Sequence, residues 1–184
     1  LQVSQNPLPE RVAFLREALE LTSSASFELR TETRKALAEA LIAQGRFDDA
    51  KHALEAAANE LEQRRQPQPK VRAKIDALRV QLYRMVGDNE SAVRIANAAL
   101  KDTAEHRGAQ GIVQTELGVF LHAEGNLKQA LSTLKQAVRS LEDTDMAAYS
   151  RAAIATGDVL RAMGEREDAL QERLEPRLPA HHLG

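Results

Sequence analysis

The chain has 184 residues, of which 43% are hydrophobic and 28% charged, with a formal net charge of -2. This balance provides no electrostatic footprint for duplex DNA or an anionic membrane. Aromatic residues make up only 3% of the chain and Trp is absent, so few side chains could stack on bases, and we expect no direct contact with nucleic acid. The absence of cysteine excludes disulfides and Cys-type zinc sites and fits a reducing compartment, so we expect a cytoplasmic location.

The N-terminal part of the chain predicts a short tail, residues 1–7, and then a helix over 8–22. No apolar run approaches the roughly 20 residues that a membrane span needs, and the start at Leu1 leaves room for a preceding segment. In the predicted helix, Leu15, Ala18 and Leu19 recur at helical spacing, as in the second helix of a helix pair. We therefore expect half of a unit whose first helix is missing.

The stretch from Gln114 to Val138 predicts two amphipathic helices joined at Gly125. Leu117 and Leu121 share one face of the first helix, and Ala130 and Leu134 share one stripe of the second. A glycine between two such helices adopts the left-handed conformation that a helix C-terminus needs at no steric cost.

This pattern returns around three more glycines, which predicts four helix pairs in one domain that spans residues 1–184. The glycines are Gly45, Gly87, Gly125 and Gly164, at intervals of 42, 38 and 39 residues. Around Gly87 the match is poorer, because Asp76 and Arg79 replace the usual residues of the first helix. The predicted repeats cover 27–66, 70–102, 103–143 and 144–175, and a tail follows over 176–184.

The order Leu117-Gly118, Leu121, Gly125, Ala130, Leu134 resembles the tetratricopeptide repeat. The intervals exceed the usual 34 residues or so, which resembles the long repeats of kinesin light chains and of bacterial regulators. The resemblance implies an all-α fold, a right-handed α–α superhelix of about four helix pairs plus an N-terminal helix. Stacked pairs of this family leave a concave groove that is lined by the first helices and binds peptides.

The register of the glycines assigns sixteen positions to this groove. They are Glu32, Lys35, Glu39, Ile42, Lys74, Ala77, Gln81, Arg84, Ile112, Thr115, Val119, His122, Arg151, Ile154, Asp158 and Arg161. Five of these side chains are basic and three are acidic, and Ile112, Val119 and Ile154 add an apolar strip. The mixture suits an extended or helical peptide with some acidic character, although exposed charges are also the default on solvated helix faces.

The residues of this chain argue against one activity of the family. Members that bind chaperone tails hold a C-terminal carboxylate with a clamp of Lys, Asn and Arg side chains. Lys35 matches that clamp, but Glu39, Leu78, Ile112 and Glu116 occupy the other clamp positions. The clamp is absent, so we do not expect this chain to bind such tails.

The sequence contains only weak signals of catalysis or metal binding, so we expect neither an enzyme nor a cofactor. His52, His106 and His122 lie in three different predicted elements without the spacing of metal ligands. The segment Gly108-Ala109-Gln110-Gly111 follows no predicted strand, so it indicates a helix start more readily than a phosphate cradle.

The sequence leaves three functional interpretations open. The first is a non-catalytic scaffold that binds a partner peptide in its groove. The second is the sensory or regulatory module of a larger bacterial transcription or signalling protein, which an upstream output domain would reveal. The third, an enzyme, would need a polar pocket with perturbed ionisable groups. The exposed ends of a short solenoid can also pair, so a homodimer is compatible with the sequence.

Overall fold

The computed structural model describes residues 7–21, 27–63 and 67–174, and their side chains over 9–21, 27–63 and 67–166. All regular structure in these ranges is helical, as the sequence predicts. The helices are α1 (Pro7–Leu21), α2 (Phe27–Ala43), α3 (Phe47–Glu62), α4 (Pro69–Met85), α5 (Asn89–Asp102), α6 (Arg107–Ala123), α7 (Leu127–Leu141) and α8 (Met146–Leu174). Residues 1–6 of the predicted tail over 1–7 lie outside the described residues, as does the predicted tail over 176–184, and Pro7 already belongs to α1.

Three of the four predicted glycine hinges connect helices at sharp turns. Gly45, Gly87 and Gly125 have φ angles of 71°, 79° and 76°, the left-handed conformation. In the turn at Gly125 the backbone N–H of Asn126 donates to the carbonyl of Leu121 at 2.9 Å, and the same bond recurs at the other two turns. This bond satisfies a carbonyl that the helix end would otherwise leave unpaired, so glycine fixes each turn.

The fourth predicted hinge is wrong. Gly164 lies inside α8, which continues unbroken from Met146 to Leu174. Within the described ranges the chain therefore has three helix pairs flanked by α1 and the single helix α8, rather than four pairs. A helix tolerates an interior glycine, and a bend forms only where the following segment gains by packing back. The sequence places Arg173 where the other repeats supply Leu54 and Leu134, so that gain is small.

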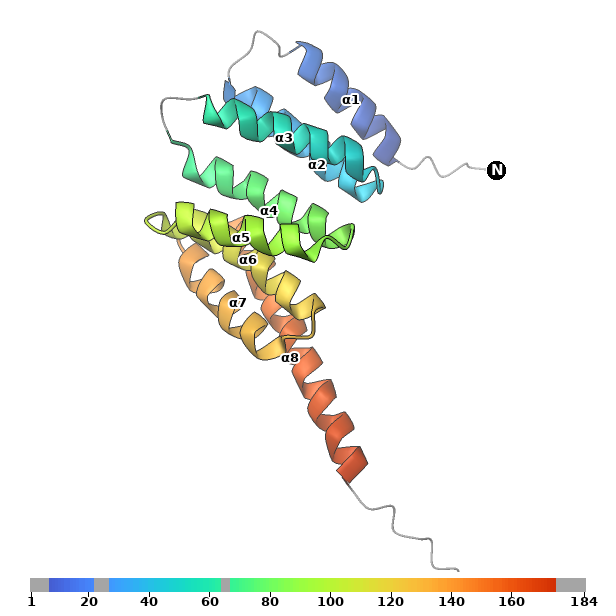
Figure 1. Cartoon of the computed structure of the whole chain (residues 1–184), viewed down its shortest axis with the longest axis vertical. Helices are drawn as coiled ribbons and strands as arrows, with labels where there is room; N and C mark the ends of the chain where they lie inside the picture. The colour runs from blue at the N-terminus through green and yellow to red at the C-terminus, as the bar shows by residue number, and fades with distance from the viewer. Residues whose placement is uncertain (1–6, 22–26, 64–66, 175–184) are drawn as a thin grey trace, which may run out of the picture.

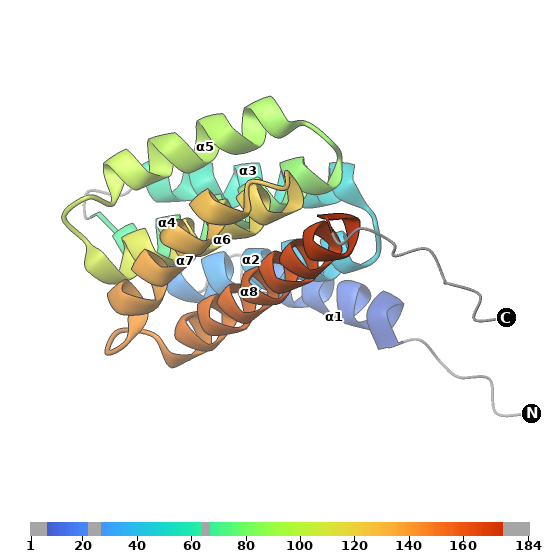
Figure 2. The same ribbon diagram turned by 90° about the horizontal axis from the view of Figure 1, so that it is seen from below.

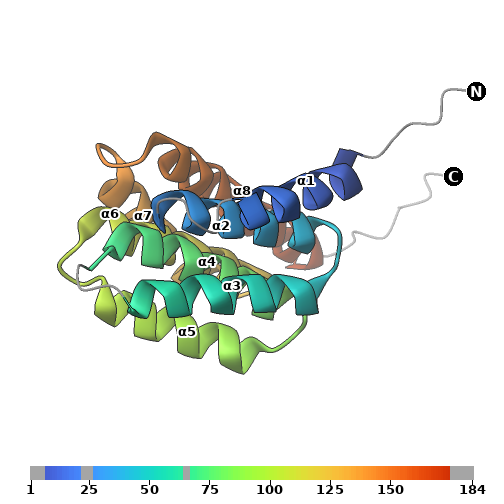
Figure 3. The same ribbon diagram turned by 90° about the horizontal axis from the view of Figure 1, so that it is seen from above.

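The helices stack in chain order along the long axis of the molecule (Figure 1), with α1 at one end and α8 at the other. Viewed along this axis, α5 and α8 lie on opposite sides with α4 and α6 between them (Figure 2). From the other end, α3 and α5 lie on the side away from α1 (Figure 3). The first helices of the pairs contact one another directly, α2 with α4, α4 with α6 and α6 with α8, and so form the inner layer of the stack.

The core between the layers consists mainly of alanine and leucine. Ala50, Ala92 and Ala130, the first alanines after the three hinges, are fully buried, and they allow the second helix of each pair to lie close to its neighbours. In α4 the unusual Asp76 is buried as well. Its carboxylate accepts hydrogen bonds from Arg72 Nε at 2.8 Å and Arg79 Nη1 at 3.0 Å, so the charge is paired where the sequence departs from the repeat pattern.

Candidate functional site

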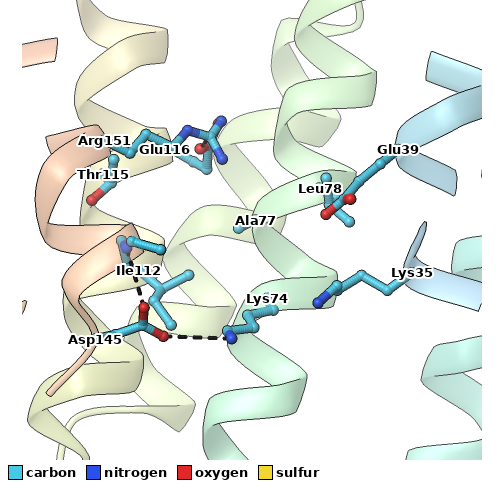
Figure 4. A pocket seen from close by; sticks show the side chains of 12 residues that line it. Lys35, Glu39, Lys74, Ala77, Leu78, Ile112, Thr115, Glu116, Asp145 and Arg151 are labelled. Carbon is cyan, nitrogen blue, oxygen red and sulfur yellow. Dashed lines mark hydrogen bonds and ion pairs between the residues drawn. The ribbon is translucent and has the colours of Figure 1, made fainter. Parts of the chain in front are cut away.

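A cavity of about 230 Å³ opens on the inner layer of the stack. Four helices supply its lining: Lys35 and Glu39 from α2; Lys74, Ala77 and Leu78 from α4; Ile112, Thr115 and Glu116 from α6; and Asp145, Ala147, Ala148 and Arg151 from the start of α8. Figure 4 shows these side chains converging from separate helices. We call this cavity the inner pocket.

The floor of the inner pocket is apolar. Ala77, Leu78 and Ile112 are nearly buried, and Ala148 packs beside them against the core. Small and branched aliphatic side chains leave a depression because none of them reaches across it. The pocket can therefore take an apolar side chain of modest size.

The basic side chains of the inner pocket are already paired. Lys35 bonds Glu32 one turn earlier on α2, and Lys74 Nζ lies 3.4 Å from Asp145 Oδ2. Glu39, one turn after Lys35, makes no ion pair in the part of the chain that the structure describes. A glutamate that precedes a lysine on a helix pairs better than one that follows it, which explains why Lys35 bonds Glu32 and leaves Glu39 open.

Asp145 fixes the start of α8 at the pocket wall. Its carboxylate accepts a hydrogen bond from the Ala148 backbone N–H at 3.2 Å, as an N-cap does, and its Oδ2 lies 3.1 Å from Lys70 Nζ. Partial burial opposes ionisation, but the Ala148 N–H and the charges of Lys70 and Lys74 outweigh it and lower the pKa of Asp145. Asp145 thus joins α8 to α4 across the pocket.

Glu116 is the buried charge of the inner pocket. Only 2% of its surface is exposed, and its Oε1 forms an ion pair with Arg151 Nη2 of α8. Burial raises the pKa of Glu116, while the positive charges of Arg151 and Arg84 act in the opposite direction. This ion pair connects α8 to α6 and keeps the guanidinium of Arg151 at the pocket wall.

The structure gathers some of the predicted groove residues and disperses others. Seven of the sixteen predicted groove positions line the inner pocket: Lys35, Glu39, Lys74, Ala77, Ile112, Thr115 and Arg151. Nine do not: Glu32, Ile42, Gln81, Arg84, Val119, His122, Ile154, Asp158 and Arg161. The predicted apolar strip is not continuous, because Val119 packs into the core beside α7 while Ile154 is 67% exposed on α8. Asp158 and Arg161 pair with each other at 2.7 Å on the surface of α8.

Sequence reasoning missed part of the pocket lining for an identifiable reason. Asp145, Ala147 and Ala148 lie in the first turn of α8 and its cap, outside the register that was counted from the hinge glycines. An aspartate three residues before Ala148 is an N-cap signal that could have placed this helix start. Leu78 and Glu116 were recognised as clamp positions, and the inner pocket is lined by all five residues at these positions.

The first helix pair matches a known family by sequence. Residues 33–62, which cover most of α2 and α3 around Gly45, match the family model described as tetratricopeptide repeat. Residues 33–62 thus form a tetratricopeptide repeat. Tetratricopeptide repeats in general mediate protein–protein interaction, and the all-α solenoid described above is their architecture.

The crystal structure of BtubC (BKLC) from P. vanneervenii is similar to this chain at 17% identity and a TM-score of 0.47, over 93% of this chain and 94% of that one. No curated protein matches the sequence.

Two classes of site find no support among the residues described. No group of three or more His, Asp or Glu side chains there could hold a metal ion. No helix in those ranges is long and apolar enough to cross a bilayer.

Proposed function

We propose that the chain is a non-catalytic interaction scaffold whose inner pocket binds an extended peptide segment of a protein partner. The observation that carries this proposal is the convergence of the four inner helices α2, α4, α6 and α8 on one pocket, whose apolar floor comes from α4, α6 and α8. A solenoid creates such a depression only by stacking, so the pocket depends on the repeat architecture itself. A peptide lying along the inner layer would place one apolar side chain on the floor between Leu78 and Ile112.

The charge of the peptide follows from the ion pairs around the pocket. An acidic peptide, which the count of groove charges favours, has to displace Glu32 from Lys35 or Asp145 from Lys74. A basic side chain finds the carboxylate of Glu39 without an ion-pair partner among the described residues. The peptide that fits best therefore carries a Lys or Arg beside its apolar residue.

Selection from a displayed library of random peptides tests this proposal. The enriched peptides should share an apolar residue next to a basic one and should lose affinity at least about tenfold for Ala147→Trp, which fills the pocket from an exposed position. The matched control Ala123→Trp changes an exposed alanine of α6 that is not part of the pocket lining, and it should bind normally.

The variant Glu39→Gln tests whether the bound peptide is basic or acidic. Loss of the basic preference alone supports the assignment of Glu39. Enrichment of acidic peptides that depend on Lys35 and Lys74 would overturn it, and peptides that bind Ala147→Trp as well as the original chain would overturn the pocket.

A further inference from the structure

In the described ranges, no helix covers the side of α8 that faces away from the stack, whereas α7 covers the same side of α6. Gly118 in α6 and Gly157 in α8 each precede the repeat glycine by the same seven residues. Because Gly118 has no side chain, it leaves a notch in the surface of α6. A Cβ added there would lie 2.4 Å from Leu134 Cγ, so the side chain of Leu134 in α7 fills this notch. A Cβ added at Gly157 would meet nothing within 4 Å. The notch is therefore present on α8 and empty.

The rest of this stripe repeats the contrast. Gly111, Gln114 and Gly118 of α6 are buried under α7, where Gln114 Nε2 donates to Gln136 Oε1 at 3.3 Å. The stripe on α8 follows the same helical spacing and is exposed throughout. It consists of Met146, Ser150, Ala153, Gly157 and Leu160. With Met146 69% and Leu160 50% exposed, α8 is an inner helix that lacks its outer partner.

The opposite end of the stack shows the converse situation. Helix α1 buries Val12 against α2 and packs Leu15 and Leu19 beside it, as an outer helix does. Phe14 and Leu21, which adjoin that face, are 68% and 76% exposed. No inner helix lies before α1 in the described chain.

Alignment of α1 with α7 shows which surface Leu21 would face. Leu15-Ala18-Leu19 has the spacing of Leu134-Ala137-Val138, which puts Leu21 at the position of Ser140. Ser140 Cβ lies 2.9 Å from where a Cβ of Gly111 would stand, so this position contacts the inner helix of its own pair. The exposed apolar side of α1 is thus the side that an inner helix would cover.

We propose that a second copy of this chain docks its α1 on the exposed stripe of α8, so that copies associate head to tail. Leu15 of the incoming copy would enter the notch at Gly157 as Leu134 enters the notch at Gly118. The contact continues the interface by which α7 covers α6, and the two surfaces lie at opposite ends of the stack (Figure 1). Because the two surfaces differ, each added copy exposes a new stripe, and association does not stop at two copies unless a ring closes.

Sedimentation velocity over a range of concentrations tests the proposal. The average mass of the original chain should rise past that of a dimer as concentration increases. Gly157→Arg blocks the stripe on α8, and Phe14→Glu places a charge on α1; each should lower the association constant at least about tenfold. Phe14 is exposed, and a side chain added at Gly157 would meet no neighbour, so far-UV circular dichroism should show unchanged helicity for both variants. Met85→Glu, a matched change at an exposed apolar side chain of α4, should associate like the original chain.

Mixing the two variants provides the sharpest test. A Phe14→Glu copy retains its stripe and a Gly157→Arg copy retains its α1, so an equimolar mixture should form dimers, and only dimers, although each variant alone stays monomeric. If the original chain stays monomeric at all concentrations, the proposal is wrong. That result is expected if another segment or another protein, rather than a second copy, covers α8. A dimer that never grows, or a mixture that stays monomeric, overturns the head-to-tail arrangement.

Discussion

Helices α6 and α8 occupy equivalent positions in successive repeats, yet one is covered and the other is open. In α6 a glycine receives Leu134 from the following helix, whereas in α8 the equivalent glycine faces empty space. The two helices carry a glycine at the equivalent position but differ at their C-terminal ends, because α6 ends in a sharp turn at Gly125 whereas α8 continues unbroken through Gly164. A repeat pattern therefore specifies which face can be covered, while the next segment decides whether it is.

The largest effect should come from Leu134→Ala, which empties the covered notch. Leu134 is fully buried between Gly118 of α6 and Val159 of α8, so the substitution should lower the free energy of unfolding by about 2–5 kcal/mol. Urea denaturation followed by circular dichroism measures this loss of unfolding free energy. A loss below about 1 kcal/mol would mean that the notch is not tightly filled.

Gly118→Ala should have the next largest effect, because it overfills the same notch. The new methyl group would stand 2.4 Å from Leu134 Cγ, and the resulting overpacking should cost about 1–3 kcal/mol of unfolding free energy. A second denaturation series checks this value. An equally stable or more stable variant would show that α7 can retreat from α6 without penalty.

Asp145→Asn should have a smaller effect that depends on pH. Asn also caps helices well, so the substitution removes mainly the ion pairs with Lys70 and Lys74, worth at most about 1 kcal/mol at a partly exposed site. The pKa of Asp145 is lowered in the folded chain, so its contribution is present above the ordinary pKa of aspartate and is lost as pH falls through the folded pKa. The stability difference between the two chains should close in acid, and a difference that is independent of pH would contradict the assignment.

Glu116→Gln should change stability in the opposite direction. Burial raises the pKa of Glu116, so the folded chain binds a proton more tightly than the unfolded chain, and the carboxylate costs stability as pH rises through the folded pKa. The amide should therefore stabilise the chain slightly at neutral pH, with no gain in acid. Stability measured across pH would contradict this if the amide variant were weaker at neutral pH, which would make the Arg151 pair the stronger influence.

Much of this architecture could be predicted from local sequence, and the exceptions have physical causes. Hinges at Gly45, Gly87 and Gly125 follow from the left-handed conformation that each turn requires. Gly164 is the same residue type but forms no bend, because a bend also requires that the following segment gains by packing back. Arg173, at the position of Leu54 and Leu134, signals in the sequence that this gain is reduced, but its size depends on contacts that form only after stacking.

For the inner pocket, part of the lining could be predicted from the sequence, but the ion pairs could not. Lys35, Lys74 and Ile112 follow from the register of the inner helices. Side-chain pairing was not predictable, because the choice of Lys35 between Glu32 and Glu39 and the contact of Lys74 with Asp145 depend on where side chains meet after stacking. A simple sum of groove charges therefore suggested an acidic ligand, although the lysines already have partners.

A last substitution, with a small effect, tests the comparison of α6 with α8 most directly. Gly157→Ala should raise the free energy of unfolding by about 0.5–1 kcal/mol in dilute solution, because alanine favours an exposed helix interior and meets no neighbour there. Measured in the same urea series, Gly118→Ala and Gly157→Ala should move stability in opposite directions. If both substitutions lowered the free energy of unfolding, or both raised it, the claim that α7 covers α6 while α8 stays open would be wrong.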